Sequence, residues 1–244
     1  MNNLAEQSLA SIVTEKFQSA QILEKYNLDF CCKGKRTLAA ACEEKGLPLE
    51  QILNELDIVL NNKIDSKNFE QMKAEELISY IILHHHFYVK QALPTITAHL
   101  DKVVYKHGSN FPYMIKVLEI FEEVNKELVL HMEKEEMVLF PKIREIELSL
   151  NYNKTTGINE NDLKMPIDVM EKEHEFVGNA LNEIRNLTNN YSILEDMCTT
   201  FKLTIAELKE FEENLHQHVH LENNILFPLA NKLVNQALKN SIVD

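Results

Sequence analysis

Glycine, proline and tryptophan are scarce in this chain of 244 residues, which contains 5 Gly, 6 Pro and no Trp. Few helix-breaking residues interrupt long stretches rich in Leu, Glu, Lys, Ile and Ala, so the composition indicates a mostly helical protein. Runs of alternating β-branched residues long enough to build a sheet are also missing from the sequence. The chain is therefore predicted to be all-α, and its 45% of hydrophobic residues suffice for a sizeable core.

Basic residues are outnumbered, with 25 Lys and Arg against 38 Asp and Glu and a formal net charge of −13. This balance disfavours nucleic acid and anionic membrane surfaces as partners. Apolar runs are too short to span a bilayer, and the first twenty residues lack the basic and apolar regions of a signal peptide. We therefore expect no membrane association and a cytoplasmic location.

Cysteine is rare as well. The four cysteines are Cys31, Cys32, Cys42 and Cys198, and their spacing does not resemble the disulfide framework of a small secreted protein. A reducing compartment is the natural inference from this pattern. Two of the four are adjacent in a polar, turn-forming stretch, which favours a chemical role for this pair over a purely structural one.

One pattern occurs twice in the sequence. The first copy reads His131-Met-Glu-Lys-Glu135-Glu-Met-Val-Leu-Phe-Pro, and the second reads His218-Val-His-Leu-Glu222-Asn-Asn-Ile-Leu-Phe-Pro. On a helix, residues four apart lie on one face, so each copy places an imidazole beside a carboxylate. A single pair of this kind is more often a solvated helix surface than a metal site. Its repetition with a shared Leu-Phe-Pro favours two facing helices that hold metal ions in a bundle core.

The domain organisation follows from composition and periodicity. Residues 1–60 are predicted to form a small helical module, and the polar, aperiodic stretch 61–70 is predicted to be a linker. The region 71–240 is predicted to be a four-helix bundle. Its long helices are expected at 72–106, 112–148, 165–188 and 193–236. Pro141 and Pro228 fall inside two of these helices and should bend them just past the His/Glu pairs.

The other two long helices supply further candidate ligands. His174 lies on the apolar stripe of the third helix, and the first helix offers His84, His85 and His86. His86 fits the apolar stripe of its helix best. Its distance in sequence from His131 nearly equals that of His174 from His218, which indicates two related hairpins. The inferred ligand set is His86, His131, Glu135, His174, His218 and Glu222.

Four imidazoles and two carboxylates form a nitrogen and oxygen donor set without thiolate. This set suits iron or manganese, and by affinity alone also zinc or copper. If both Glu bridge, each of two ions receives two His and two carboxylate oxygens, an oxo or hydroxo bridge adds a ligand, and a position stays open for O₂ or NO. Such a site is a non-haem di-iron centre. Glu127 and Glu173 are candidates for orienting an imidazole.

The whole pattern resembles a known family. The stretch 71–240 is similar to a hemerythrin-like up-down four-helix bundle. Together with the N-terminal Asp29-Phe-Cys-Cys-Lys-Gly-Lys-Arg-Thr-Leu38 motif, it resembles the repair of iron centres family of di-iron proteins. The ligand positions of that family fall on the six residues inferred above, which implies two non-haem iron ions bridged by oxo and carboxylate groups. The family commonly has Gly where this chain has Lys33, a change that bears on Cys31 and Cys32.

The resemblance implies a role in repairing iron–sulfur clusters after nitrosative or oxidative stress. The di-iron centre would donate iron, remove nitric oxide by redox chemistry, or do both, so its status as an enzyme stays open. Damaged iron–sulfur proteins would be its clients, and NO or O₂ its small ligands. Cys31 and Cys32 would bind a cluster fragment, exchange disulfides or take up NO. The alternative is a hemerythrin-like protein that binds or senses O₂ or NO. The oligomeric state is open, with a homodimer as one option.

Overall fold

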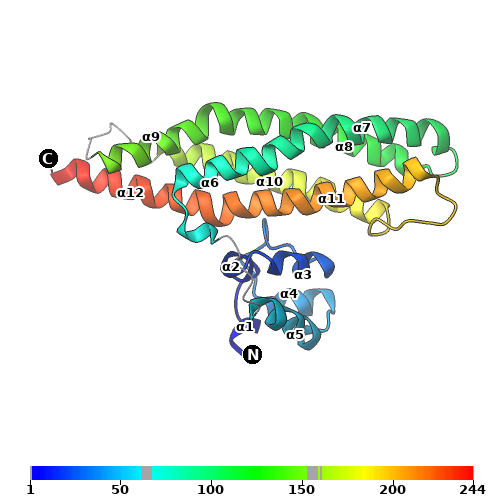
Figure 1. The fold of residues 1–244 in the computed structure, drawn as a ribbon, viewed down its shortest axis with the longest axis horizontal. Helices are drawn as coiled ribbons and strands as arrows, with labels where there is room; N and C mark the ends of the chain where they lie inside the picture. Colours follow the sequence, from blue (N-terminus) through cyan, green and yellow to red (C-terminus); the bar gives the residue numbers. More distant parts are fainter. Residues whose placement is uncertain (1, 62–67, 153–158, 160, 244) are drawn as a thin grey trace.

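The computed structural model describes residues 2–61, 68–152, 159 and 161–243. Within these ranges the chain forms helices and no strand, apart from one isolated bridge between Ser8 and Thr37. Figure 1 shows a small module of short helices lying against the side of a long four-helix bundle. The predicted all-α fold with an N-terminal helical module and an up-down bundle is therefore confirmed.

Short helices build the N-terminal module. They are α1 (Asn2–Ala5), α2 (Leu9–Glu15), α3 (Ser19–Lys25), α4 (Leu38–Lys45) and α5 (Leu49–Leu60). Ser8 and Thr37 cap the N-termini of α2 and α4, because each side-chain oxygen accepts a hydrogen bond from a backbone N–H in the first turn. Gly46 ends α4 with a left-handed backbone conformation at φ 62°, which glycine adopts without strain.

Three of the four long helices of the bundle contain a five-residue π-helical segment. The first consists of α6 (Ala74–Ile81), η2 (Ile82–His86) and α7 (Phe87–His107). The second consists of α8 (Tyr113–Lys134), η3 (Glu135–Leu139) and α9 (Phe140–Asn151). The third is the uninterrupted α10 (Asn161–Leu187), and the fourth consists of α11 (Thr199–Leu221), η4 (Glu222–Leu226) and α12 (Phe227–Val243).

The π segments were not predicted, although prolines lie next to two of them. Pro141 and Pro228 have no N–H to give to the carbonyl four residues back, as the sequence indicates. The backbone adapts through a wider turn, in which Phe140 N–H bonds to Glu135 O and Phe227 N–H bonds to Glu222 O. In the first long helix Phe87 N–H bonds to Ile82 O in the same way, without a proline after it.

Helix ends differ modestly from the predicted ranges. The third long helix begins at Asn161, four residues before its predicted start, and the fourth begins at Thr199 and not at 193. Asn189, Asn190 and Tyr191 all have positive φ, which ends the third long helix at Leu187, and residues 192–198 form non-helical turns before the fourth helix begins. Most of the predicted linker (62–67) lies outside the described residues, and Phe69–Gln71 forms a single 3₁₀ turn, η1.

Two apolar clusters fill the interior, one on each side of a polar layer. One cluster joins the module to half of the bundle and includes Leu9 and Phe30 with Leu93 and Phe211. The other fills the opposite half of the bundle, around Phe140 and Phe227, and is formed mainly by α6, α9 and α12. None of the described helices has an apolar stretch of the length needed to cross a bilayer.

Candidate metal centre

The six ligands inferred from sequence lie together in the polar layer between the two apolar clusters. His86 ends η2, Glu135 and Glu222 begin η3 and η4, and His131, His174 and His218 project from α8, α10 and α11. All six side chains are buried, and both Glu are fully inaccessible. Each π segment thus contributes one of its end residues to the site, in agreement with the frequent occurrence of π turns at functional sites.

The imidazoles meet in two pairs through their Nε2 atoms. Nε2 of His86 lies 3.1 Å from Nε2 of His218, and Nε2 of His174 lies 3.0 Å from Nε2 of His131. Each pair forms a group with Glu135 and Glu222 in which all the donor atoms lie within 4.8 Å of one another. Two adjacent positions for an ion are therefore formed, and they share both carboxylates.

Each carboxylate faces both pairs of imidazoles. Glu222 places Oε1 3.0 Å from Nε2 of His218 and Oε2 3.2 Å from Nε2 of His174. Glu135 Oε2 lies 3.4 Å from Nε2 of both His86 and His131. This is the arrangement that bridging carboxylates adopt between two metal ions in a bundle core.

Three of the four imidazoles have a hydrogen-bond partner on the outer nitrogen. Nδ1 of His86 lies 2.7 Å from Glu136, and Nδ1 of His131 lies 2.9 Å from Glu173. Nδ1 of His174 lies 2.9 Å from the Asn223 side-chain oxygen. If each Nδ1 carries the proton and donates it outward, Nε2 presents a lone pair to the interior, as a metal ligand requires. The sequence had indicated Glu173 for this role.

The fourth imidazole is the exception. His218 Nδ1 is buried and has no hydrogen-bond partner among the described residues. The neighbouring His85 stacks its ring on His218 at an interplanar angle of 8°. Its Nδ1 atom hydrogen-bonds to Asn214 and not to His218. The sequence offers Glu127 only as a candidate, with a solvated surface Glu as the favoured alternative, and Glu127 makes no hydrogen bond or ion pair within the described part of the chain.

The phenylalanines of the two Leu-Phe-Pro motifs cover the site, a role that the sequence did not indicate. Phe140 stacks on His86 with the ring centroids 5.7 Å apart, and Phe227 stacks on His174 at an interplanar angle of 5°. Both phenylalanines are almost fully buried. They separate the polar layer from the second apolar cluster and hold two ligand rings in place.

The imidazoles of the site differ in pKa because burial and the two carboxylates act on them to different extents. Burial lowers the pKa of His86, but the adjacent carboxylates of Glu135 and Glu222 outweigh this effect and raise it to about 10. Burial also lowers the pKa of His174, but the hydrogen bond and the charge of Glu222 outweigh burial and raise this pKa to about 9. For His218, burial dominates and lowers the pKa to about 3. The metal-free site therefore carries protons where cations would bind.

The donor set fits a pair of divalent cations. Neither oxygen of Glu135 receives a hydrogen bond, although both are fully buried. Burying two carboxylates in an apolar core is costly unless positive charge compensates them. Ions bound at the two positions would supply that charge and would replace the protons on His86 and His174.

The module brings Cys31 and Cys32 to the outer side of the same layer. Cys32 Sγ lies 3.8 Å from the backbone oxygen of His174, and the Asn224 side chain donates to the backbone oxygen of Cys31. Gly178 of α10 lies at this approach, and a Cβ there would sit 3.6 Å from Cys32 Sγ, in ordinary van der Waals contact. The thiols thus adjoin a ligand that lies more than 140 residues away in sequence.

The loop that carries the two cysteines accommodates Lys33 without strain, since its φ is not positive. Its N–H donates to Asp29 Oδ1 at 3.2 Å. Gly34 is the demanding position, because a Cβ there would lie 2.2 Å from the backbone oxygen of Phe30. The loop conformation is therefore compatible with lysine at position 33.

His216 and His220 join the module to the bundle. His216 Nδ1 lies 2.7 Å from Glu24 of α3, and its pKa is raised to about 9 because Glu24 outweighs the effect of burial. His220 packs edge-on against Phe30 and lies 3.3 Å from the Thr14 hydroxyl. Both histidines lie beside the ligand His218 in sequence but serve the interface between the two parts.

Comparison with known proteins covers both parts of the chain. Residues 5–59 match the ScdA_N domain of unknown function (DUF542), and residues 77–230 match the hemerythrin HHE cation binding domain. The chain is similar to the iron-sulfur cluster repair protein ScdA of Staphylococcus epidermidis, with 32% identity over 91% of this chain and 96% of that one. It is similar to the iron-sulfur cluster repair protein YtfE of Yersinia pseudotuberculosis, with 32% identity over 92% and 96% of the two chains.

Proposed function

This chain belongs to the family of iron–sulfur cluster repair proteins, and from that premise we propose that it restores damaged iron–sulfur clusters by means of two iron ions. The observation that carries the proposal is the buried set of four His and two Glu, in which both carboxylates are shared by two groups of ligands. His86 and His218 would hold one ion, and His131 and His174 the other, with Glu135 and Glu222 between them.

Iron is the metal that we propose because it suits a donor set of imidazole and carboxylate, and because the relatives of this chain are iron-sulfur cluster repair proteins. Two iron ions would supply reversible electron transfer and positions for NO or O₂. Glu136, Glu173 and Asn223 would hold three of the four imidazoles in the tautomer that binds metal. The apolar clusters on both sides would exclude bulk water from the ions.

Repair requires that iron or redox equivalents reach a client protein, and the module offers the route. Cys31 and Cys32 would act there because they adjoin His174 and border a cleft. The clients would be iron–sulfur proteins damaged by NO or oxidants. We place this activity in the cytoplasm, where the four cysteines, which form no disulfide, would stay reduced.

Metal analysis of the full-length protein tests the proposal. Protein purified without oxygen after growth with ample iron should contain about two irons per chain and should show the absorption of an oxo-bridged pair once oxidised. Glu135→Ala and His174→Ala should lose both properties. His99→Ala is the matched control, because His99 lies on the same long helix as His86 but pairs with Glu207 at 2.7 Å. One zinc per chain, or no metal, would overturn the proposal.

A second measurement distinguishes repair from simple binding of gas. The iron-loaded protein should restore activity to an iron–sulfur enzyme damaged by NO, and the Glu135→Ala variant should not. Iron transferred to the client in proportion to the recovered activity would identify donation, whereas NO consumption without iron loss would identify redox removal. Reversible O₂ or NO binding with no recovery of the client would contradict repair and leave a binding protein.

A further inference from the structure

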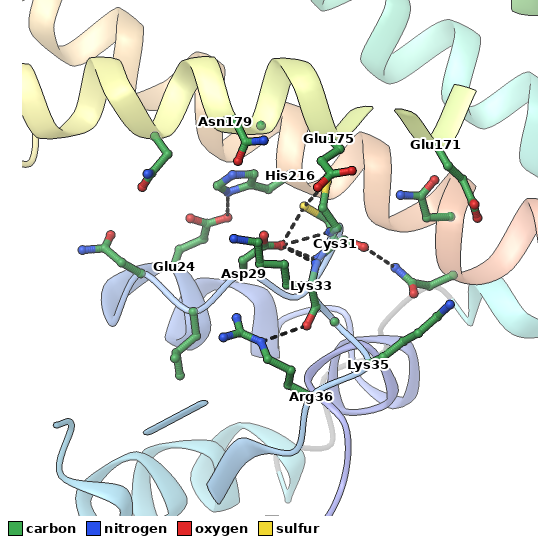
Figure 2. Close-up of a pocket in the computed structure, with 18 of the residues that line it drawn as sticks. Glu24, Asp29, Cys31, Lys33, Lys35, Arg36, Glu171, Glu175, Asn179 and His216 are labelled. Carbon is green, nitrogen blue, oxygen red and sulfur yellow. Dashed lines mark hydrogen bonds and ion pairs between the residues drawn. The ribbon is translucent and has the colours of Figure 1, made fainter. Parts of the chain in front are cut away.

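A cleft of about 540 Å³ separates the Cys31–Cys32 loop of the module from α10 and α11 of the bundle. Figure 2 shows Glu171 and Glu175 on the bundle side of this cleft and Lys33, Lys35 and Arg36 on the module side. Cys31 and Cys32 lie where the module side of the cleft contacts α10 of the bundle. Cys32 is partly accessible, and Cys31 is 5% exposed. The cleft therefore leads from solvent to a pair of thiols that adjoins the candidate metal centre.

The distance between the two sulfurs is informative. Cys31 Sγ and Cys32 Sγ lie 3.7 Å apart. Two thiolates on one tetrahedral ion, with metal–sulfur bonds of about 2.3 Å, lie about 3.8 Å apart. A disulfide would need about 2.05 Å. The two sulfurs are therefore spaced as ligands of one ion.

A third donor completes one face of such a site. Asp29 Oδ1 lies 3.3 Å from Cys31 Sγ, near the roughly 3.5 Å expected between an oxygen and a sulfur on one tetrahedral ion. Donor atoms of Asp29, Cys31 and Cys32 all lie within 4.8 Å of one another.

The loop is held in this shape by its own backbone. Asp29 Oδ1 accepts hydrogen bonds from the N–H groups of Cys31, Cys32 and Lys33, at 3.1, 3.0 and 3.2 Å. These bonds fix the peptide units that carry the thiols, so little ordering remains for an ion to impose. The thiols are therefore arranged for binding before any ion arrives.

Binding of a divalent ion to the pair is balanced in protons and electrons. The ion would bond to both sulfurs as thiolates, any proton carried by either sulfur would leave to solvent, and no electron would be transferred.

We propose that Cys31 and Cys32, with Asp29 as third donor, form a separate mononuclear site for a thiophilic divalent cation of the Fe²⁺ and Zn²⁺ class. The fourth position faces the cleft, which the Glu175 side chain also lines from the bundle side. Given the proposed repair function, this site would hold ferrous iron on its way between the bundle and the cysteines of a client. A client thiolate entering the cleft could take the ion by exchange of ligands.

Titration of the full-length protein with Co²⁺ in the absence of oxygen tests this site. Cobalt bound to thiolate shows a charge-transfer band in the near ultraviolet that cobalt bound to His and Glu lacks. The band should grow to one Co²⁺ per chain, and either Cys31→Ser or Cys32→Ser should abolish it. Cys198→Ser is the matched control, because Cys198 is exposed at the N-cap of α11, lies 3.3 Å from His107 and does not line the cleft. Circular dichroism confirms that each variant is folded.

Two further variants separate this site from the di-metal centre. Glu135→Ala should keep the thiolate band while losing the irons of the bundle. Asp29→Asn should weaken Co²⁺ binding about tenfold or more, since the amide keeps an acceptor for the loop but loses the charge. No thiolate band in the wild-type protein, or a band that persists in both serine variants, would overturn the inference and leave the repair proposal standing. A thiolate band in a wild-type protein whose bundle binds no iron would refute the repair proposal and leave the inferred thiolate site standing.

Discussion

Loading the metal-free protein with Fe²⁺ at pH 7 should release about two protons per chain from the di-metal centre. The prediction follows from His86 and His174, whose pKa values of about 10 and about 9 keep both rings about 99% or more protonated at pH 7. Only a neutral imidazole binds a cation, so each ring must lose its proton first. His218, with a pKa of about 3, is already neutral and contributes none.

The sign and slope of the pH dependence follow from the same values. Raising the pH removes the competing protons, so metal affinity should increase with pH. The logarithm of the association constant should rise by about two per pH unit between pH 7 and 9 and by about one per unit between pH 9 and 10. Above pH 10 this contribution should be complete. Over pH 7 to 9 alone the affinity gain is about four orders of magnitude.

Calorimetry in two buffers with different ionisation enthalpies counts the released protons. The titration is made in a Cys31→Ser, Cys32→Ser protein, so that the thiols of the module add nothing to the count. NMR titration of the metal-free protein supplies the control, since Glu222→Gln should lower the pKa of His174, whose main partner is Glu222. Fewer than one proton released at pH 7, together with an affinity that is flat from pH 7 to 9, would refute the reasoning.

Substitutions at three other positions test separate parts of the structure. Glu173→Gln should lower metal affinity about 10- to 100-fold, measured by competition with a chelator, because the hydrogen bond that orients His131 loses its charge; an unchanged affinity would remove Glu173 from the site. Gly178→Leu should push Cys32 away from α10, so that its thiol reacts faster with a maleimide, whereas Gly178→Ala should be tolerated because a Cβ fits at 3.6 Å; equal rates for the two variants would contradict the packing. Phe121→Ala should lower the free energy of unfolding by about 3–5 kcal/mol in denaturant titration, since Phe121 is fully buried in the first apolar cluster; a loss below about 1 kcal/mol would show that the site collapses around the cavity.

The candidate ligand set could be proposed from the sequence because the spacing of residues along a helix determines the direction in which their side chains point. His131 and Glu135 must share a face if the segment is helical, and the second copy then predicts a second such face. His86 was distinguished from His85 by small differences in apolar periodicity. Both rings are buried in the structure, but only His86 lies in a group of candidate metal ligands with Glu135 and Glu222.

Contacts across the bundle were beyond the reach of the sequence. Glu136 and Asn223 follow the two glutamates directly, yet each bonds to a histidine from another helix. Such pairs depend on the rotation of neighbouring helices, which local pattern does not encode. The Asn189 to Tyr191 turn lies between two helices as predicted, but its left-handed conformation was not predicted, because two asparagines in a polar stretch do not by themselves specify such a turn.

The π segments at the polar layer also determine how the apolar stripes on the two halves of the bundle are aligned. Glu135 and Phe140 are both buried although they are five residues apart, as are Glu222 and Phe227. In a regular α-helix, five residues end about 140° away from the starting direction. Each π segment therefore acts as a one-residue insertion. It rotates the helix that follows, so that the apolar face of that helix again points to the core. Deleting a single residue from 222–226 would rotate all of α12 by about 100° and turn Ala230 and Val234 away from the core.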